Sequence, residues 1–278
     1  MKKIALISGT SSGIGLASAI ALAKAGYHVV ATMRNIAKAD ALRNAAQAAD
    51  IQLQIAEMDV ESDASVNACV QQVLSEHGRI DLLLNNAGSG YLGTLEETSI
   101  ADAKRVMEVN FFGVWRVTQA VLPAMRAARA GHIISVSSIG GLRGVPFNDA
   151  YCAAQFAVEG MMESLVALVQ HYGIQVSVIE PGPVHTEFVA SVRQKIEEHD
   201  NGLADYAEYR SKLLASTQQA FAAAGQTPDE IASVIVRAAL ADQPDFRYPT
   251  SEIVKALVLR KYVDATGNSV RDDAGARL

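Results

Sequence analysis

The chain has 278 residues, half of them hydrophobic and 19% charged, with a formal net charge of −6. This composition supplies enough apolar side chains for a large core and argues against disorder, and one α/β domain of this length is ordinary. The net negative charge, with lysines and arginines scattered along the chain, gives no electrostatic support to a nucleic-acid surface. We therefore expect a single folded domain that does not bind nucleic acid.

Only two cysteines occur, Cys69 and Cys152, far apart and without the spacing of metal ligands. This pattern suits a reducing compartment and offers neither a disulfide framework nor a zinc site. The first apolar run breaks at Ser8 after four residues, which is too short for a signal core or a membrane span. We expect a cytoplasmic protein with no transmembrane segment and no bound metal.

Short β-rich runs alternate with longer helix-like segments along the chain. We expect strands at 4–7, 28–32, 52–56, 82–84, 133–136 and 176–179, and helices at 14–25, 37–49, 65–77, 101–128 and 151–171. Strands that are apolar on both faces and separated by helices indicate a parallel sheet covered on both sides. With right-handed crossovers, the prediction is a doubly wound α/β domain.

The first expected strand runs into Ser8-Gly9-Thr10-Ser11-Ser12-Gly13-Ile14-Gly15, which opens the first helix. Gly9 permits a tight turn, Gly13 lets the backbone approach a ligand, and Gly15 lets the helix pack close to the sheet. The amides at the helix start then face an anion such as a pyrophosphate. A glycine cluster alone can be a structural turn, but its place between strand and helix predicts dinucleotide binding.

The second expected strand ends in Thr32-Met33-Arg34, without the carboxylate that usually holds the ribose 2′-hydroxyl of NAD. Arg34 offers a planar guanidinium suited to a 2′-phosphate, and Ser11 adds a hydroxyl donor. We therefore expect NADP(H), the alternative being that Arg34 is a solvated surface charge. Asp59, which precedes Val60 after the third strand, is either a partner for the adenine amine or a helix N-cap.

Further motifs follow the glycine turn in the order of the short-chain dehydrogenase/reductase family, which the chain resembles over about residues 1–250. They are Asn85-Asn86-Ala87-Gly88 after the fourth strand, Asn110 in a helix, Ser138 after the fifth strand, Tyr151 thirteen positions later, and Pro181-Gly182-Pro183-Val184-His185-Thr186 after the sixth. The resemblance implies a Rossmann-like fold, in which the Asn-Asn-Ala-Gly turn and the Pro-Gly segment lie beside the cofactor.

The resemblance also implies roles for individual side chains. Tyr151 would be the catalytic acid or base, Ser138 would hold the reacting oxygen, and Asn110 would support a relay water. Thr186 would contact the nicotinamide carboxamide, and the hydride would move on the B face of the ring. A lone serine after a strand or a lone tyrosine in a helix is usually a turn or packing residue, so the assignment depends on their joint placement with the glycine turn.

A closer resemblance is to the branch that contains type 1 17β-hydroxysteroid dehydrogenase and related retinol dehydrogenases. It rests on residues 32–34, 140–151 and 182–186, with a weaker match at 247–250. It implies a hydrophobic alcohol or ketone substrate such as a steroid or retinoid.

The family commonly pairs through long helices, which correspond here to 101–128 and 151–171. We therefore expect a homodimer or homotetramer. Four apolar residues on these helices are either available for this contact or part of the core: Phe112, Trp115, Met161 and Leu165.

The chain departs from the family at Gln155, where the family's Tyr-x-x-x-Lys pattern has lysine. Residues i and i+4 share a helix face, so Gln155 points where the lysine would. A glutamine amide can still hydrogen-bond the ribose, but it carries no charge that would lower the pKa of Tyr151. At ~4–5 Å and an effective dielectric of about 20, the lost attraction is at most roughly 3–4 kcal/mol, or about 2–3 pKa units. We expect a slower enzyme whose oxidation reaction is pushed toward alkaline pH.

Residues 182–227 are more polar and irregular, with a helix expected at 204–223. They follow the last expected strand, at the sheet edge where ligands bind, so we expect a substrate cover, with a disordered insertion as the alternative. The apolar stretch 253–259 is expected to form a core-facing or partner-facing helix rather than a membrane contact. His185 either contacts substrate or stacks in its loop, and His132, at an element edge, is expected to be solvated.

The predicted function is an NADP(H)-dependent oxidoreductase that interconverts a hydroxyl and a carbonyl group on a hydrophobic substrate. Two alternatives remain. One is a regulatory or disabled protein that binds NADP(H) without turnover because the lysine is missing. The other is a non-redox enzyme on the same scaffold, which the cofactor turn and Arg34 argue against.

Overall fold

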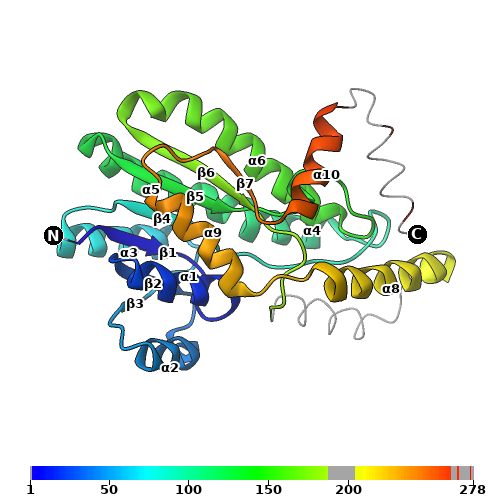
Figure 1. Cartoon of the computed structure of the whole chain (residues 1–278), viewed down its shortest axis with the longest axis horizontal. Coiled ribbons are helices and arrows are strands. Elements are labelled where there is room, and N and C mark those ends of the chain that lie inside the picture. The colour runs from blue at the N-terminus through cyan, green and yellow to red at the C-terminus, as the bar shows by residue number, and fades with distance from the viewer. Residues whose placement is uncertain (1, 187–203, 264–267, 269–275, 277–278) are drawn as a thin grey trace.

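The computed structural model describes residues 2–186 and 204–263, together with 268 and 276. Its centre is a seven-stranded parallel sheet in the order β3-β2-β1-β4-β5-β6-β7 (Figure 1). The strands are β1 (Ile4–Ile7), β2 (His28–Met33), β3 (Gln54–Glu57), β4 (Leu82–Asn85), β5 (Gly131–Val136), β6 (Ile174–Glu180) and β7 (Arg247–Pro249). The chain order reverses between β1 and β4, so the single doubly wound α/β domain predicted from the sequence is confirmed.

Helices cover both faces of the sheet. One face carries α1 (Gly13–Lys24), α2 (Asp40–Ala48) and α9 (Pro228–Leu240), and the other carries α3 (Asp63–His77), α5 (Gly113–Ala128) and α6 (Asp149–Val169). Figure 1 shows α4 (Ile100–Met107), α8 (Ala207–Ala224) and α10 (Glu252–Val263) beyond the ends of the central strands. Short helical turns complete the chain: η1 (Ile36–Lys38), η3 (Ile139–Gly141), η4 (Gln170–Tyr172) and η5 (Ala204–Tyr206).

Successive residues of the central strands pack into two different cores. Leu6, Leu83 and Ile133 belong to the core under α3, α5 and α6. Their neighbours Ile7, Leu84 and Ile134 belong to the core under α1, α2 and α9. Because alternate side chains of a strand point to opposite faces, both sets must be apolar. This explains why the strands stand out in the sequence as unbroken apolar runs.

The single long helix expected at 101–128 is interrupted. Between α4 and α5 the chain forms a π-helical turn, η2 (Glu108–Phe112). Asn110, in this turn, is buried, and its amide group bonds to backbone atoms outside the turn. The expected helix 37–49 is likewise divided into η1 and α2.

Helix α9 and strand β7 were not expected from the sequence. The start of α9 nevertheless carries a complete capping box, in which Thr227 and Glu230 bond to each other's backbone, with Pro228 in the first turn. Strand β7 has three residues and ends in Pro249, so it offers no periodic signal. It pairs with β6 and brings Arg247 to the edge of the sheet.

One helical stretch, Asp149–Tyr172, meets the length and hydropathy expected of a membrane-crossing helix, which is weak evidence because core helices meet the same criterion. Its residues Val158, Met162 and Val169 are packed into the core beside the sheet.

The expectation that His132 is solvated is wrong. Its ring lies in β5 with 5% of its surface exposed, and Nε2 is 3.0 Å from the Ser177 hydroxyl. Burial lowers the pKa of His132 to about 4, and the charge of Lys3 acts in the same direction. The ring is therefore neutral at physiological pH.

Candidate active site

A cavity of about 750 Å³ opens at the carboxyl ends of the strands. It contains most of the residues that the sequence predicted for cofactor binding and catalysis. From the predicted set these are Gly9, Ser11, Ser12, Gly13, Ile14, Gly15, Asn86, Ala87, Gly88, Asn110, Ser138, Tyr151, Gln155, Pro181, Gly182, Val184 and Thr186. Arg34, Asp59 and Val60 do not line it.

The glycine turn after β1 is held against the loop after β4 by Asn86. The Asn86 side-chain nitrogen donates to the carbonyl oxygens of Ser8 and Gly9, at 3.0 and 2.9 Å. In return, the Ser8 hydroxyl accepts from the backbone amides of Asn86 and Ala87, both at 3.0 Å. These bonds fix the two loops at the point where the strand order reverses, which is where open α/β sheets bind ligands.

Two positions in this turn require glycine. Gly9 has φ +71°, and a Cβ there would lie 2.7 Å from Cα of Ala87. A Cβ on Gly15 would lie 2.2 Å from the carbonyl oxygen of Gly9, so helix α1 could not start as close to the turn.

The start of α1 has the form of an anion site. Ser12, the N-cap residue, makes no side-chain capping bond, and the following residues Gly13, Ile14 and Gly15 line the cavity. The first amides of a helix have no partner within the helix and carry the positive end of its dipole. A dinucleotide pyrophosphate fits this position.

Arg34 lines a separate hollow of about 210 Å³, together with Ser11, Met33, Asn35 and Lys38. Arg34 Nη1 lies 3.1 Å from Glu61 Oε2, and the Arg34 side chain is 71% exposed. Two cations and a hydroxyl group thus border the hollow, beside the glycine turn, which suits a phosphate group. Lys38 was not predicted as a cofactor-binding residue. The sequence feature that could have identified it is a second cationic side chain four residues after Arg34.

Asp59 and Val60 lie away from both hollows. Asp59 Oδ1 accepts from the Glu61 amide at 3.1 Å, and Ser62, not Asp59, is the N-cap of α3. The N-cap alternative for Asp59 is therefore wrong. Val60 is buried under Gly113, and its carbonyl oxygen accepts a hydrogen bond from Arg116.

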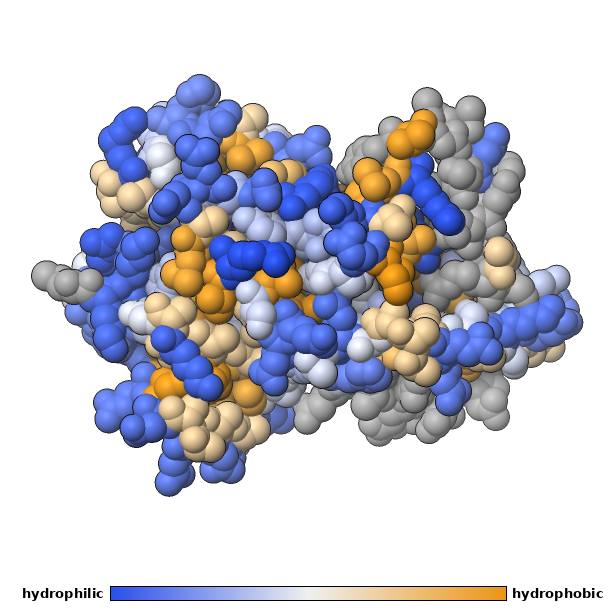
Figure 2. Space-filling model, in the orientation of Figure 1, coloured by the Kyte–Doolittle hydropathy of each residue, from blue (hydrophilic) through white to orange (hydrophobic). Residues whose placement is uncertain are grey.

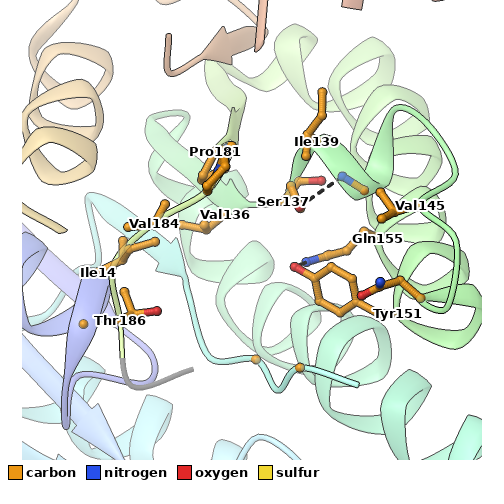
Figure 3. A pocket seen from close by; sticks show the side chains of 18 of the residues that line it. Ile14, Val136, Ser137, Ile139, Val145, Tyr151, Gln155, Pro181, Val184 and Thr186 are labelled. Atoms are coloured by element: carbon orange, nitrogen blue, oxygen red, sulfur yellow. Dashed lines mark hydrogen bonds between the residues drawn. The ribbon is translucent and has the colours of Figure 1, made fainter. Parts of the chain in front are cut away.

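Tyr151, Gln155 and Ser138 are brought together on one side of the cavity. The Gln155 side-chain nitrogen donates to the Tyr151 hydroxyl at 3.1 Å, and Ser138 also hydrogen-bonds to that hydroxyl. The Ser138 hydroxyl in turn accepts from the Gly140 amide at 3.0 Å. Figure 3 shows Tyr151 and Gln155 facing each other, across the cavity from Ile14, Val184 and Thr186.

The environment of Tyr151 keeps its hydroxyl protonated. Burial raises the pKa of Tyr151 above its ordinary value of 10.0, and the hydrogen bonds from Gln155 and Ser138 only partly oppose this shift. Gln155, 6% exposed, adds no charge at this position. The hydroxyl is therefore a proton donor at neutral pH.

Asn110 clamps the loop after β4. Its Oδ1 accepts from the Ser89 amide at 2.9 Å, and its Nδ2 donates to the carbonyl oxygens of Ser89 and Val106, at 2.9 and 3.0 Å. Both amide protons are thus used, which leaves Oδ1 with one free lone pair. The role of holding a relay water stays a prediction.

The segment after β6 crosses between the two halves of the cavity. Thr186 lies beside the glycine turn. Its Cγ2 atom is 3.3 Å from the point that a Cβ atom would occupy if residue 13 were not glycine. The two alternatives for His185 are decided in favour of stacking, because its ring packs on Phe221 at 5.4 Å and does not line the cavity. Residues 187–203 of the expected substrate cover lie outside the described residues.

Helices α8 and α10 supply the other wall of the cavity. Leu213, Thr217 and Phe221 of α8 line it, as do Ile253 and Leu257 of α10. Figure 2 shows the apolar side chains gathered along α10. The sequence predicted these two helices but not which of their residues face the cavity.

A buried charge cluster lies one helical turn beyond Gln155. Arg247 pairs with Glu159 and, at 2.7 and 3.0 Å, with Glu180 and Glu163. Burial raises the pKa of Glu180 to about 7, and the charge of Glu159 adds to this shift. That Arg247 in β7 meets three carboxylates was not predicted from the sequence.

Comparison with known proteins agrees with this geometry. Residues 3–197 match the family described as short chain dehydrogenase. Retinol dehydrogenase 8 of Bos taurus is 40% identical over 270 residues, which cover 95% of this chain and 86% of that protein. The human 17-beta-hydroxysteroid dehydrogenase type 1 is 38% identical, covering 96% and 83%. The crystal structure of a metagenomic short-chain oxidoreductase in complex with NADP has a TM-score of 0.70 and 26% identity, covering 89% and 96%.

Proposed function

The chain belongs to the short chain dehydrogenase family, and from this premise we propose that it is an NADP(H)-dependent reductase of a ketone on a hydrophobic substrate. The observation that carries the proposal is that Ser138 and Tyr151 share a hydrogen bond in the same cavity that the glycine turn lines. The steroid and retinoid enzymes among its relatives support a substrate of that kind.

The residues at the glycine turn fit a bound dinucleotide. The amides that begin α1 would hold the pyrophosphate, and Arg34 with Ser11 and Lys38 would hold a 2′-phosphate. When bound, NADPH supplies the hydride for the carbonyl carbon. Val184 and Thr186 would border the nicotinamide, since both line the cavity between this turn and Tyr151.

Tyr151 and Ser138 act on the carbonyl oxygen. Ser138 donates a hydrogen bond that orients this oxygen, and Tyr151 transfers its hydroxyl proton to it as the carbon becomes tetrahedral. The phenolate left on Tyr151 takes a proton from water. Gln155 donates to the Tyr151 oxygen in both states, but without a positive charge it stabilises the phenolate less than a lysine would.

The protonated Tyr151 hydroxyl group is the form that the reductive step uses. Reduction uses the protonated hydroxyl group, which the buried site provides at neutral pH. Oxidation of an alcohol needs the phenolate as base, and a raised pKa makes that form scarce. We propose slow turnover in the reductive direction. The alternative, for which the uncharged Gln155 is the reason, is a protein that binds NADP(H) without turnover.

We also propose that residues 182–186, α8 and α10 cover the substrate, because residues of all three line the cavity that Ser138 also lines. Pairing of two copies through η2 and α5 is proposed from Phe112 and Trp115, which are 44% and 47% exposed. Met161 and Leu165 instead pack against the core. Location in the cytoplasm stays a prediction from the two cysteines, which are buried and unpaired.

The test is NADPH oxidation followed at 340 nm with steroid and retinoid ketones, beside NADH as control. We expect turnover with NADPH that exceeds turnover with NADH. A chain that binds NADPH tightly but reduces none of the ketones, while Gln155→Lys does reduce them, would establish the disabled alternative.

A further inference from the structure

Arg210, near the start of α8, joins this helix to the loop that follows β4. Its guanidinium forms an ion pair with the carboxylate of Glu97, and the two side chains are 21% and 15% exposed. Thr94 holds the same carboxylate, because its amide and its hydroxyl group donate to Glu97 Oε2 at 3.2 and 2.7 Å. The ion pair is thus largely shielded from solvent, and its acidic partner is fixed by bonds within its own loop.

The guanidinium of Arg210 also covers the ring of Phe147. Arg210 Cζ lies 5.8 Å from the centre of this ring, which is a cation–π distance. Tyr206 meets the same ring edge-on at 6.4 Å, and Phe147 is buried. The Phe147 carbonyl oxygen accepts from the amide of Gly93 at 2.7 Å. The loop after β4, the loop before α6 and the start of α8 therefore meet at this ring.

The backbone of Phe147 lies in a region that residues other than glycine rarely adopt, with φ +62°. A residue stays in such a conformation only where its surroundings hold it there. Asn148 and Tyr151, which follow it at the start of α6, both line the main cavity. The ring of Phe147 thus links α8 to the segment from which the helix of Tyr151 begins.

The elements that Arg210 joins form two sides of the substrate chamber. After Arg210, α8 contributes the buried Leu213, and then Thr217, to the cavity lining. The loop on the other side of the ion pair contributes Tyr91 and Leu92. The width of the chamber between these residues therefore depends on how α8 is held.

Arg210 holds this wall from outside, since it is not among the described residues that line the cavity. A hydrophobic substrate makes few directional bonds, so its affinity depends on close packing against the walls of its pocket. Loss of one partner of a shielded ion pair leaves the other charge uncompensated. Without Arg210, α8 would be held less firmly and would pack less closely on the substrate.

Building on the reductase function proposed above, we propose that Arg210 is a positioning residue for the substrate. Its ion pair with Glu97 and its contact with Phe147 hold α8 as a fixed wall of the chamber and thereby set the affinity for hydrophobic ketones. Arg210 takes no part in proton or hydride transfer and does not bind the cofactor.

The test removes each partner of the ion pair alone and both together. Arg210→Gln, Glu97→Gln and the double variant would be compared with the unchanged chain in the reduction of androstanedione, an uncharged steroid diketone, by NADPH. Arg210→Lys keeps the charge. Lys212→Gln is the matched control, because it removes an exposed ion pair with Glu208 from the same helix. Thermal unfolding of each variant checks that it folds.

We expect Arg210→Gln and Glu97→Gln each to raise KM for the ketone about ten-fold and to leave kcat within about two-fold. The double variant should lose no more than either single variant, since the same ion pair is removed. Arg210→Lys should recover part of the affinity, and Lys212→Gln should leave it unchanged. Single effects that multiply in the double variant, or a loss confined to kcat, would overturn the proposal.

Two measurements that need no turnover separate this proposal from the reductase function: calorimetric binding of androstanedione to the NADPH-loaded chain, and hydrogen exchange of the α8 amides. We expect Arg210→Gln to weaken binding and to speed exchange in α8 but not in α9. If androstanedione is not reduced but both effects are seen, the positioning role stands and the reductase function falls. If it is reduced with unchanged KM by Arg210→Gln, the reductase function stands and the positioning role falls. Unchanged exchange in α8 would overturn the positioning role whatever the turnover.

Discussion

The side-chain nitrogen of Gln155 donates a 3.1 Å hydrogen bond to the hydroxyl oxygen of Tyr151. The tyrosine oxygen is the acceptor in this contact, so its own proton stays available for a substrate oxygen. An amide can hold the oxygen in place as a lysine would, but it does not supply the charge that favours a phenolate. In this chain residue 155 therefore orients the Tyr151 oxygen without lowering the pKa of Tyr151 by a positive charge, whereas a lysine would do both.

Tyr151→Phe removes the proposed proton donor while leaving the ring in place. We expect ketone reduction to fall by at least about 100-fold, in line with the contribution of a positioned acid. Binding of NADPH, measured by fluorescence titration, should change little, because the residues that face the pyrophosphate lie at the start of α1. Undiminished turnover would remove Tyr151 from the mechanism.

Gln155→Lys restores a cation beside Tyr151. The pKa of Tyr151, now raised by burial, should fall, and the phenolate would form at lower pH. We expect the rising limb of the pH profile for alcohol oxidation to move to lower pH by about 2–3 units.

Gln155→Met is the matched control for that profile, since it loses the hydrogen bond without gaining charge. The rising limb of the pH profile for Gln155→Met should stay at alkaline pH. A profile for Gln155→Lys that coincides with that of the unchanged chain would show that residue 155 does not set the pKa of the reacting group.

Arg34→Gln tests the hollow that Arg34 shares with Ser11 and Lys38. Loss of one charge-assisted contact to a 2′-phosphate should raise KM for NADPH about ten-fold and leave KM for NADH unchanged. Glu61→Gln, which removes the ion-pair partner of Arg34, should leave KM for NADPH equal or lower. Parallel losses with both cofactors would place Arg34 outside the cofactor site.

Glu180→Gln tests the charge cluster around Arg247. The folded protein holds a proton on Glu180 up to a pKa of about 7, whereas an unfolded chain loses it near the ordinary value of 4.5. The stabilising effect of this proton is therefore fully present below about pH 4.5 and is lost as the pH rises through 7. Glutamine mimics the protonated form, so the variant should be more stable than the unchanged chain at pH 8.5, by about 1–2 kcal/mol.

Urea unfolding at pH 5.5 and pH 8.5 measures this difference, with Glu163→Gln as the control. The Glu163 side chain is 68% exposed, so its removal should change stability little at either pH. The unchanged chain should lose stability between pH 5.5 and pH 8.5. An equal loss in Glu180→Gln would show that Glu180 does not titrate in this range.

The sequence predicted the central sheet well because its strands are buried on both faces. Leu82, Leu83 and Leu84 are all fully buried, and such runs are visible without any knowledge of tertiary contacts. The doubly wound arrangement of the parallel sheet followed from the alternation of strands with helices. The residues around the reacting groups could therefore be assigned from their motifs.

The features that the sequence did not predict depend on contacts between distant segments. The π-helical turn at Asn110 is accompanied by bonds to Ser89 across the β4 loop, which helical periodicity does not reveal. Strand β7 is too short for a pattern and exists because Arg247 and Tyr248 pair with β6.

The hydrogen bonds of Asn86 and Asn110 join the glycine turn, where the cofactor would bind, to the side of the cavity where the substrate would bind. Asn86 ties the β4 loop to the phosphate side through Gly9, and at Ser89, three residues after Asn86, Asn110 ties the same loop to the turn η2 between α4 and α5. The cofactor side and the substrate side of the cavity are therefore held at a fixed separation by the protein's own hydrogen bonds.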